Sequence, residues 1–566
     1  MPFLKVNDGT ADRTPQNNAA SRIVAIAVLE IALIVVCFAA ITGQAAPNVN
    51  ESHYLTKAKH FWNPSYCPGD IFLSSSFSHL AFYVSTGWLT LIFSLSTYAW
   101  IGRILSWTLI AIGWRRVCQQ LFSVPIMSVL AAVFFVILNQ RFHLAGEWVV
   151  GGFEAKGIAY GFVLLAISFL LQHRWRWVWP LLGAASMFHV LVGGWSTIAA
   201  GVCFLSTLDQ RSLRKPRGVS NVLKQLRQQA VPLLIGFAIA LIGIVPPLLT
   251  DASPELQQRA NAIYVSQRIS HHLNFASFPV AHISRFTILV FVWWYFSRWI
   301  IKVTGDTLIQ SRLKLLRIFT VTALAISFAG LVLSGMAEQG GEGATFANQF
   351  LRFYLFRLSD FAVAAALALV TGLIIAQWVK DRSDFPHQVC AAIFIGCIAV
   401  AGIALAQENH ADGRPNADAR SLPHFPEDKN RTDDIFKNWK RACHWVAENT
   451  AEDAVFITPA QQQTFKWYAH RAEICCWKDV PQNPVAMVQW KSRIDDLVVP
   501  QRTSDLGIFT YSDEQLRFFA EKYGATHLIA MQSESDTVAK VDSRTKLKQI
   551  YPPDPKQKTT WVVFEF

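Results

Sequence analysis

Long apolar stretches separated by short polar segments dominate the chain up to Leu405. From Ile23 onward these stretches reach roughly 17 to 25 residues, the length of a helix that crosses a bilayer, and they are apolar on all sides. A buried helix of a soluble protein is usually shorter and carries one apolar stripe. The pattern predicts a mainly α-helical, polytopic membrane bundle over residues 22–406, with Glu30 turned toward the bundle interior rather than toward lipid.

Basic residues between the apolar stretches set the expected topology. Segments 210–228 and 298–317 are rich in Lys and Arg, which marks them as cytoplasmic by the positive-inside rule. Residues 1–21 form a polar tail that we also expect to be cytoplasmic. This arrangement predicts about eleven transmembrane helices, of which two are joined by a tight turn near His189. It places the first outer loop, 42–79, on the same extracytoplasmic face as the C-terminal end.

Three apolar blocks follow that loop, at 79–96, 98–114 and 121–138. Only two of them can be full crossings if the basic segments lie in the cytoplasm. We therefore expect the third to be an interfacial or re-entrant helix.

The composition becomes that of a soluble protein after Gln407. Residues 407–434 are rich in charge, Pro and Asn and are predicted to be a linker. In residues 435–566, helical spacing of Phe436, Trp439, Cys443 and Val446 is followed by short β-type runs. The order helix, strand, helix, strand predicts a small α/β domain. It contains neither a Gly-rich phosphate loop nor a G-x-S-x-G sequence, so we expect an accessory domain or lid.

The overall composition agrees with a membrane protein and changes two further expectations. Hydrophobic residues make up 52% of the chain and charged residues 16%, and the net charge is +12. Because the excess Lys and Arg lie in connecting loops, the basic balance reflects topology and does not indicate a nucleic-acid partner. The nine cysteines show no metal-ligand spacing, and a disulfide from Cys443 to Cys475 or Cys476 is left open.

The first outer loop carries the most unusual chemistry. Glu51 and Asp70 lie among aromatic residues and cations at the mouth of the predicted bundle. They are too far apart to share one helical face, so any pairing has to be tertiary. In a glycosyl transfer one carboxylate would take the proton of the acceptor hydroxyl, and the second would orient the acceptor or bind a divalent cation. The alternative is a solvated loop anchored by interfacial aromatics.

Further polar segments fall on the same predicted face, which suggests one outward-facing cavity. Each has a structural alternative: a Glu–Lys pair that caps a helix, a histidine that is hydrogen-bonded in packing, or an Arg–Asp salt bridge. Arginines near membrane depth are retained where they meet an anion such as a lipid phosphate. The candidate substrate-binding residues are His53, Glu154, Lys156, His189, His271, His272, Arg352, Arg357 and Asp360.

With these residues in place, the plan resembles the GT-C superfamily of integral-membrane glycosyltransferases. The resemblance rests on Asn50–Tyr54 and Pro68–Asp70 in the first outer loop, on Glu154 as a later acid, and on a C-terminal soluble domain. It implies transfer of a sugar from a polyprenyl-phosphate donor, with Arg352 and Arg357 holding the phosphate. The chain lacks the W-W-D-Y-G type sequence of the oligosaccharyltransferase branch, and its first loop lacks a carboxylate dyad.

The end of the chain, from Trp439 through Arg471–Glu473 and Trp490–Arg493, is similar to that of an uncharacterised bacterial membrane family, and no activity is carried over from it. We expect the protein in a bacterial inner (plasma) membrane. The functional hypothesis is a glycosyltransferase with Glu51 and Asp70 in catalysis. Its partners would be a polyprenyl-phosphate sugar lipid, membrane lipids, and a glycan, lipid or protein acceptor. Two alternatives remain open: a lipid or solute transporter (flippase), and a non-catalytic envelope assembly protein. Internal repeats with broken helices, which many transporters show, are not evident in the sequence.

Overall fold

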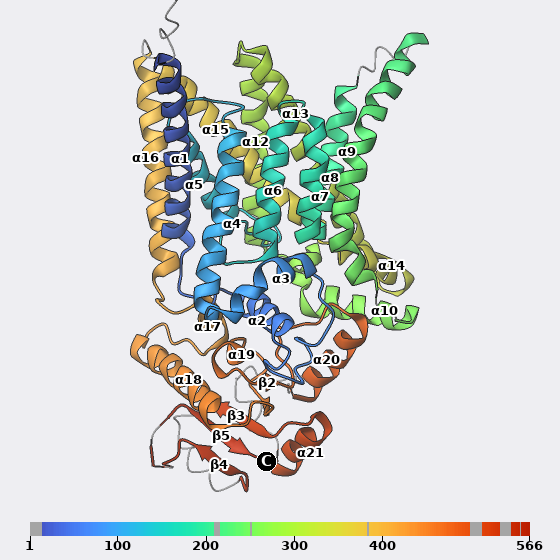
Figure 1. Cartoon of the computed structure of the whole chain (residues 1–566), viewed down its shortest axis with the longest axis vertical. Coiled ribbons are helices and arrows are strands. Elements are labelled where there is room, and N and C mark those ends of the chain that lie inside the picture. The colour runs from blue at the N-terminus through green and yellow to red at the C-terminus, as the bar shows by residue number, and fades with distance from the viewer. Residues whose placement is uncertain are drawn as a thin grey trace, which may run out of the picture.

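The computed structural model describes residues 14–208, 216–249, 252–381, 384–497, 512–531, 545–554, 556–557 and 559–566. Within them, eight helices are long and apolar enough to cross a membrane, and they stand side by side in one bundle (Figure 1). The chain is a multi-pass membrane protein. The eight helices are α1 (Thr14–Thr42), α4 (Leu95–Cys118), α8 (Val190–Thr207), α9 (Pro216–Leu248), α12 (Val280–Val303), α13 (Thr307–Glu338), α15 (Arg357–Lys380) and α16 (Phe385–His410).

Three shorter helices pack among these eight: α5 (Met127–Arg141), α6 (Ala155–Leu170) and α7 (Trp175–Phe188). Helix α7 packs against α6, α8 and α9. The turn that joins α7 to α8 falls at His189, as predicted. Helices α5, α6 and α7 are shorter than a typical full crossing, so the count of eleven stays a prediction.

Helix α15 forms the centre of the bundle. All its residues from Leu358 to Ala376 are buried, and it contacts α5, α8, α12, α13 and α16. Its many alanines allow neighbouring helices to approach closely. The outer helices α1, α9 and α16, by contrast, leave large apolar side chains such as Val28, Leu234 and Ile403 exposed. These outer faces have the character of a surface covered by lipid.

Charged side chains inside the bundle are paired. Glu30 of α1 accepts a hydrogen bond from Arg115 Nε of α4 at 2.7 Å and another from the backbone N–H of Ile126 at 2.8 Å. The prediction that Glu30 faces the bundle is confirmed.

One end of the bundle is built from short helices and loops (Figure 1). The apolar block 79–96 forms two short helices at this end, as expected for an interfacial or re-entrant segment. Blocks 98–114 and 121–138 lie in α4 and α5. The short helices here are α2 (Glu51–Trp62), α3 (Leu80–Thr86), η1 (Gly87–Leu91), α10 (Pro254–Ala262), η3 (Ile263–Arg268), α11 (Ser270–Leu273), η4 (Phe275–Ser277) and α14 (Gly341–Leu351).

The C-terminal region adds a mixed sheet of five strands in the order β2-β1-β3-β5-β4. Strands β2 and β3 run parallel to β1, whereas β5 pairs antiparallel with both β3 and β4. The strands are β1 (Val455–Ile457), β2 (Ala472–Glu473), β3 (His527–Met531), β4 (Lys548–Tyr551) and β5 (Trp561–Glu565). The helices are α17 (Asn416–Ser421), α18 (Lys429–Asn449), α19 (Phe465–Ala469), α20 (Pro484–Leu497) and α21 (Asp513–Tyr523).

Helix α18 covers the sheet with the apolar face that the sequence predicts. Trp439, Cys443 and Val446 are buried, and the Trp439 ring packs against the ring of Trp561 on β5 with centroids 4.7 Å apart. All nine cysteines are free, so Cys443 forms no disulfide with Cys475 or Cys476.

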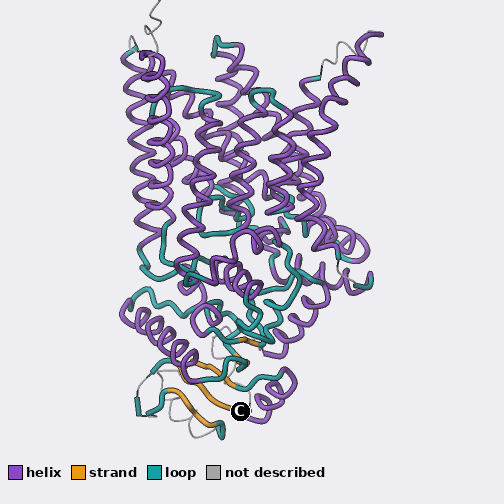
Figure 2. The backbone as a smooth tube through the Cα atoms, viewed as in Figure 1, coloured by secondary structure: helices purple, strands orange, loops and turns teal. Residues whose placement is uncertain are grey.

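The segment 407–434, predicted to be a linker, is more ordered than its composition suggests. It contains the last residues of α16, the whole of α17 and the start of α18. The backbone N–H of Ala417 donates to the carbonyl of Pro47, and buried Asp418 accepts hydrogen bonds from Thr464 and Tyr468. These contacts fix the C-terminal domain against the bundle. Figure 2 shows the loops concentrated between the bundle and the sheet.

Candidate functional site

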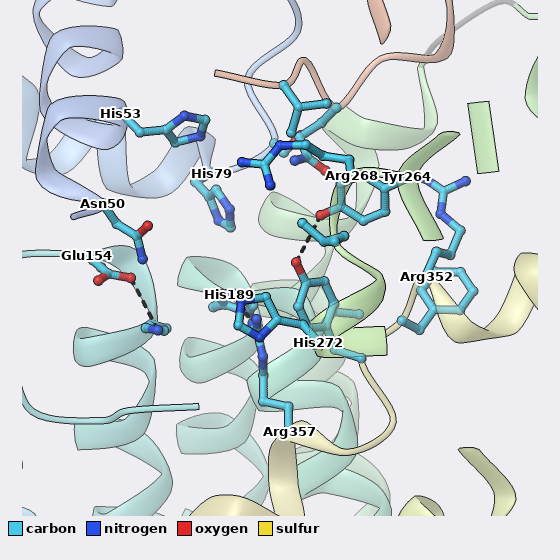
Figure 3. A pocket seen from close by; sticks show the side chains of 18 of the residues that line it. Asn50, His53, His79, Glu154, His189, Tyr264, Arg268, His272, Arg352 and Arg357 are labelled. Atoms are coloured by element: carbon cyan, nitrogen blue, oxygen red, sulfur yellow. Dashed lines mark hydrogen bonds and ion pairs between the residues drawn. The ribbon is translucent and has the colours of Figure 1, made fainter. Parts of the chain in front are cut away.

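A cavity of about 630 Å³ lies where the bundle meets the C-terminal domain. Its wall combines residues from α2, from loop 145–156, from η3 and α11, from segment 352–357, and from segment 478–484 of the C-terminal domain (Figure 3). The polar and aromatic residues that line it include Asn50, His53, Tyr54, His79, Glu147, Trp148, Glu154, Lys156, His189, Tyr264, Arg268, His271, His272, Arg352, Tyr354, Arg357, Arg420 and Lys478.

Cations outnumber carboxylates among these residues by six to two. The two carboxylates, Glu147 and Glu154, are both buried. Lys156 Nζ lies 3.7 Å from Glu147 Oε2 and 3.4 Å from Glu154 Oε2, and Arg357 Nε lies 3.1 Å from Glu147 Oε2. These two cations and two carboxylates balance one another, which leaves four cations around the cavity without a carboxylate from its wall.

Three of the remaining cations bond only to neutral groups within the described residues. Arg352 Nη1 donates to Asn261 Oδ1 at 2.7 Å. Arg268 Nε donates to the carbonyl of Trp477 at 2.7 Å, and Lys478 Nζ donates to Asn50 Oδ1 at 2.6 Å. Burial, reinforced by nearby Arg268, lowers the pKa of Lys478 to about 8. Cations that donate to neutral groups and form no salt bridge among the described residues give the cavity an electrostatic character that favours an anion.

Histidines form the second feature of the wall. His79 bonds to the hydroxyl of Tyr54 at 3.2 Å and donates to the carbonyl of Phe188 at 3.2 Å. His272 Nδ1 donates to the carbonyl of Ala145 at 2.5 Å. Burial lowers the pKa of His79 to about 4 and that of His272 to about 3, so both rings are neutral near pH 7. His189 bonds through Nε2 to Arg357 at 2.7 Å.

His53 differs from the other histidines because its partner is a carboxylate. Its Nδ1 lies 2.9 Å from Asp479 Oδ1 of the C-terminal domain. The ring stacks on Phe72 with centroids 4.2 Å apart. Burial lowers the pKa of His53, while Asp479 opposes that shift.

The structure brings together eight of the predicted substrate-binding residues. His53, Glu154, Lys156, His189, His271, His272, Arg352 and Arg357 all line the cavity. Their segments are far apart in the sequence but meet at one end of the bundle, on the same side as the C-terminal domain (Figure 1). The expectation that these polar segments share one face agrees with this arrangement.

Asp360 does not line the cavity. It is buried in the first turn of α15, and its carboxylate accepts backbone hydrogen bonds from Leu144, Ala145 and Glu147 at 2.7–3.2 Å. Those bonds use the oxygens that a substrate would need. Asp360 therefore holds loop 144–147, which carries Glu147 into the wall, and it makes no salt bridge with Arg352 or Arg357.

Glu51 is also away from the cavity surface. Its side chain is fully buried and accepts hydrogen bonds from Nε and Nη2 of Arg103 at 2.7 and 2.6 Å. It also accepts the backbone N–H groups of Asn48 and Phe153, each at 2.7 Å. Both oxygens of this carboxylate are therefore engaged by the protein. This placement favours a structural role for Glu51, and the catalytic role stays a prediction.

Asp70 occupies a different buried network, at the domain junction. It accepts the backbone N–H groups of Phe72 and Leu73 at 3.0 and 2.9 Å. Lys466 Nζ, from α19, lies 3.2 Å from Asp70 Oδ2, 2.5 Å from Glu473 Oε1 and 2.7 Å from Asp479 Oδ2. Asp70 thus joins the first outer loop to the C-terminal domain, and its catalytic role stays a prediction.

The sequence leaves open whether the protein binds a divalent cation, and the same network contains a group of possible metal ligands. Glu473, Cys476 and Asp479 lie close enough together to offer ligand atoms to a metal ion. The ammonium group of Lys466 already lies between Glu473 and Asp479. A protein cation therefore holds the position that a metal would take.

Sequence analysis missed several wall residues. Glu147 and Arg268 lie in segments that the pattern of polar loops does indicate, beside Glu154 and His271. A count of charges in those segments could have identified them. Lys478 and Asp479 gave no such signal, because their approach to the cavity depends on how the C-terminal domain packs on the bundle.

Residues 437–497 match a family model described as a domain of unknown function (DUF6798). No curated protein matches the chain. Solved structures that the chain resembles include the Archaeoglobus fulgidus oligosaccharyltransferase in the apo form (TM-score 0.46, 11% identity, 90% of this chain and 69% of that chain). The same enzyme with Zn and sulfate gives a TM-score of 0.43 at 14% identity over 92% and 70% of the two chains.

A third structure is archaeal oligosaccharyltransferase AglB from Archaeoglobus fulgidus in complex with an inhibitory peptide and a dolichol-phosphate. It aligns with a TM-score of 0.40 and 11% identity, over 90% of this chain and 69% of that chain. Likenesses at this distance carry no argument about activity, which has to rest on the cavity itself.

Proposed function

We propose that this protein is a membrane glycosyltransferase of the GT-C type. It would move a sugar from a polyprenyl-phosphate-linked donor to an acceptor at the outer face of the plasma membrane. The observation that carries the proposal is the excess of cations without carboxylate partners around a cavity at the end of a membrane bundle. Arg352, Arg268 and Lys478 hold positive charge there against neutral partners only.

The wall favours an anion attached to a lipid over a freely soluble one. Ile244, Pro247 and Leu248, at the end of the outer helix α9, line the cavity together with Phe353. Leu248 is 73% exposed and Phe353 42% exposed. An apolar rim beside a cationic interior suits a ligand that places its phosphate inside and its hydrocarbon chain in the bilayer.

Two carboxylates beside the cations suit a sugar. Glu154 Oε2 faces Lys156 at 3.4 Å, and the other oxygen of Glu154 has no hydrogen-bond partner recorded among the described residues. Carboxylate oxygens accept hydrogen bonds from sugar hydroxyls. Trp148 contributes an aromatic ring to the same wall and already packs against the Lys156 ammonium at 4.2 Å. Glu154 and Trp148 would orient the sugar while the cations hold its phosphate.

The experiment is transfer of radiolabelled sugar from a panel of polyprenyl-phosphate sugars by purified protein in lipid vesicles. The test variant is the double substitution Arg352→Gln with Lys478→Gln, which removes two cations that have neutral partners. The matched control is Arg441→Gln with Lys437→Gln on the exposed side of α18. We expect transfer by the wild type and by the control, and a loss of at least 100-fold in the test variant.

Absence of transfer from every donor by folded wild-type protein would contradict the proposal. Flipping of the same lipids by that protein would then support the transporter alternative. Binding of the lipids with neither transfer nor flipping would support a non-catalytic assembly role.

A further inference from the structure

The imidazole of His53 and the carboxylate of Asp479 form a bonded pair across the domain junction. His53 lies on α2 and lines the cavity. Asp479 belongs to the C-terminal domain and is buried. Their separation of 2.9 Å, between Nδ1 and Oδ1, leaves the opposite ring nitrogen, Nε2, without a hydrogen-bond partner among the described residues. The arrangement is a histidine oriented through one nitrogen by a carboxylate, with its other nitrogen available.

The carboxylate in this pair is itself held rigidly. Asp479 Oδ2 lies 2.7 Å from Lys466 Nζ, and Lys466 is fixed by Glu473 and Asp70 at 2.5 and 3.2 Å. The hydroxyl of Thr458 donates to the second oxygen of Glu473 at 2.6 Å. The Phe72 ring packs against the imidazole and restricts its rotation. A chain of ion pairs that starts in the C-terminal sheet therefore fixes the plane of a cavity-lining histidine.

We propose that His53 is the proton acceptor of the transfer reaction and that Asp479 is its positioning residue, so that the C-terminal domain completes the active site. The inference rests on the proposed glycosyl transfer. Glu147 and Glu154 are less suited to the task, because both form ion pairs with Lys156 or Arg357 at 3.1–3.7 Å. The first outer loop would still supply the base, through His53 rather than Glu51 or Asp70.

The acceptor hydroxyl oxygen forms a bond to the anomeric carbon of the sugar, and its proton passes to His53 Nε2. The bond between the anomeric carbon and the phosphate oxygen breaks, and its electron pair leaves with the polyprenyl phosphate. The cations of the wall hold the negative charge that develops on that phosphate. Asp479 stabilises the imidazolium that forms and keeps the proton of neutral His53 on Nδ1.

Charged and titratable groups surround His53 on three sides. Asp479 and Lys478 face it from the C-terminal domain, Lys57 from its own helix, and His79 from the loop before α3. Burial lowers the pKa of His53 below its ordinary value, so the ring is neutral and able to accept a proton at pH 7. The activity of the free enzyme should therefore rise with pH through an inflection below about 6.5, the ordinary pKa of histidine.

The test compares His53→Asn and Asp479→Asn with the wild type in the radiolabelled transfer assay. Asn at position 53 can keep a donor toward Asp479 but removes the nitrogen that accepts the proton. We expect His53→Asn to lower kcat by at least about 100-fold, with donor binding unchanged and the low-pH inflection abolished. The matched control is His444→Gln, an exposed histidine on α18, which should keep full activity.

Asp479→Asn should lower kcat less and move the inflection to lower pH, because the carboxylate that favours protonated His53 is lost. A purely structural role would reduce the amount of folded protein and leave that inflection in place. Asp495→Asn, an exposed carboxylate on α20, is the control for this variant. If His53→Asn does not accumulate in the membrane, the comparison of the pH profiles of the wild type and of Asp479→Asn tests the role of His53. An inflection at lower pH in Asp479→Asn supports that role, and an unchanged inflection contradicts it.

Transfer by the wild type that persists in His53→Asn with an unchanged pH profile would overturn this inference and leave the proposed function standing. Absence of transfer by the wild type from every donor would overturn both. The two failures are thus distinct results of one experiment.

Discussion

Two sets of charged residues in this molecule look alike in the sequence but differ in the structure. In the first set, around Glu51 and Arg103, every carboxylate oxygen and most of the guanidinium is satisfied by the protein. In the second set, in the cavity wall, Arg352 and Lys478 are bonded only to side-chain amides. Both sets lie at the same end of the bundle.

Under the proposed function, the first set of charges holds the fold and the second set binds an anionic ligand. A buried ion pair whose members are fully satisfied adds little net stability over an apolar replacement, but breaking it is costly. A cation bonded to a neutral amide loses hydration without gaining a counter-charge. Its position is explained most simply by an anionic ligand. Removing charge from the first set should therefore damage folding, and removing it from the second set should damage binding.

The largest effect is expected for Arg103→Met, which leaves the Glu51 carboxylate buried and without its counter-charge. We expect a loss of about 3–5 kcal/mol in the free energy of unfolding. The measurement is thermal unfolding of the protein purified in detergent. The double variant Arg103→Met with Glu51→Gln should recover part of this loss, because no uncompensated charge remains.

The same double variant tests the two assignments of Glu51 against each other. Neither Glu51 nor Arg103 lines the cavity, so transfer per folded molecule should stay within a few-fold of the wild type. Loss of transfer in a variant that folds normally would support a catalytic role for Glu51.

A smaller effect, confined to binding, is expected for Arg352→Gln. One charge-assisted hydrogen bond to a phosphate oxygen contributes about 1.5–3 kcal/mol, which corresponds to roughly a 10- to 100-fold loss in kcat/KM for the donor. The midpoint of thermal unfolding should not fall, because within the described residues Arg352 contacts only neutral groups, the amide of Asn261 and the ring of Phe353. A destabilised Arg352→Gln protein with a normal donor KM would remove the distinction drawn between the two sets.

The sequence predicts the membrane bundle, the helix α18 and most of the cavity wall, each for a physical reason. Apolar length alone indicates a spanning helix, and the polar segments that meet at the cavity are unusual enough to be recognised singly. Glu154, His189 and Arg357 were found in this way. The positive-inside rule, together with the alternation of membrane crossings, also predicted that these segments lie at one end of the bundle. The structure brings them together there.

The roles of the acids could not be predicted in the same way. Glu51 and Asp70 have the residue type and the setting of catalytic carboxylates, and only tertiary structure shows that Arg103 and Lys466 neutralise them. Asp479 is the opposite case: nothing in its sequence setting suggests a role in the site, because it lies in a domain whose sequence carries no catalytic motif. It comes to lie beside His53 only when α19, β2 and the segment after β2 pack on the first outer loop. Pairing across domains leaves no periodic signal in one sequence.

The smallest expected effect concerns Lys478, which is half-buried beside Arg268 and has a pKa of about 8. This value is below the ordinary pKa of lysine but lies between pH 7 and pH 9. The ammonium is therefore mostly charged at pH 7 and loses its proton as the pH rises to 9. The phosphodiester of a polyprenyl-phosphate sugar stays ionised throughout that range. Because a cation that holds the phosphate is lost, kcat/KM for the donor should fall by roughly tenfold or less between pH 7 and 9.

In Lys478→Met the value at pH 7 should already be reduced and should then change little up to pH 9. His79 and His272 do not interfere, since burial keeps both rings neutral over the whole range. The contrast with Arg352 sharpens the comparison, because Arg352→Gln should keep the same decline with pH as the wild type. If Lys478→Met kept the wild-type decline, Lys478 would not be part of the anion site, and its bond to Asn50 would serve only to join the C-terminal domain to α2.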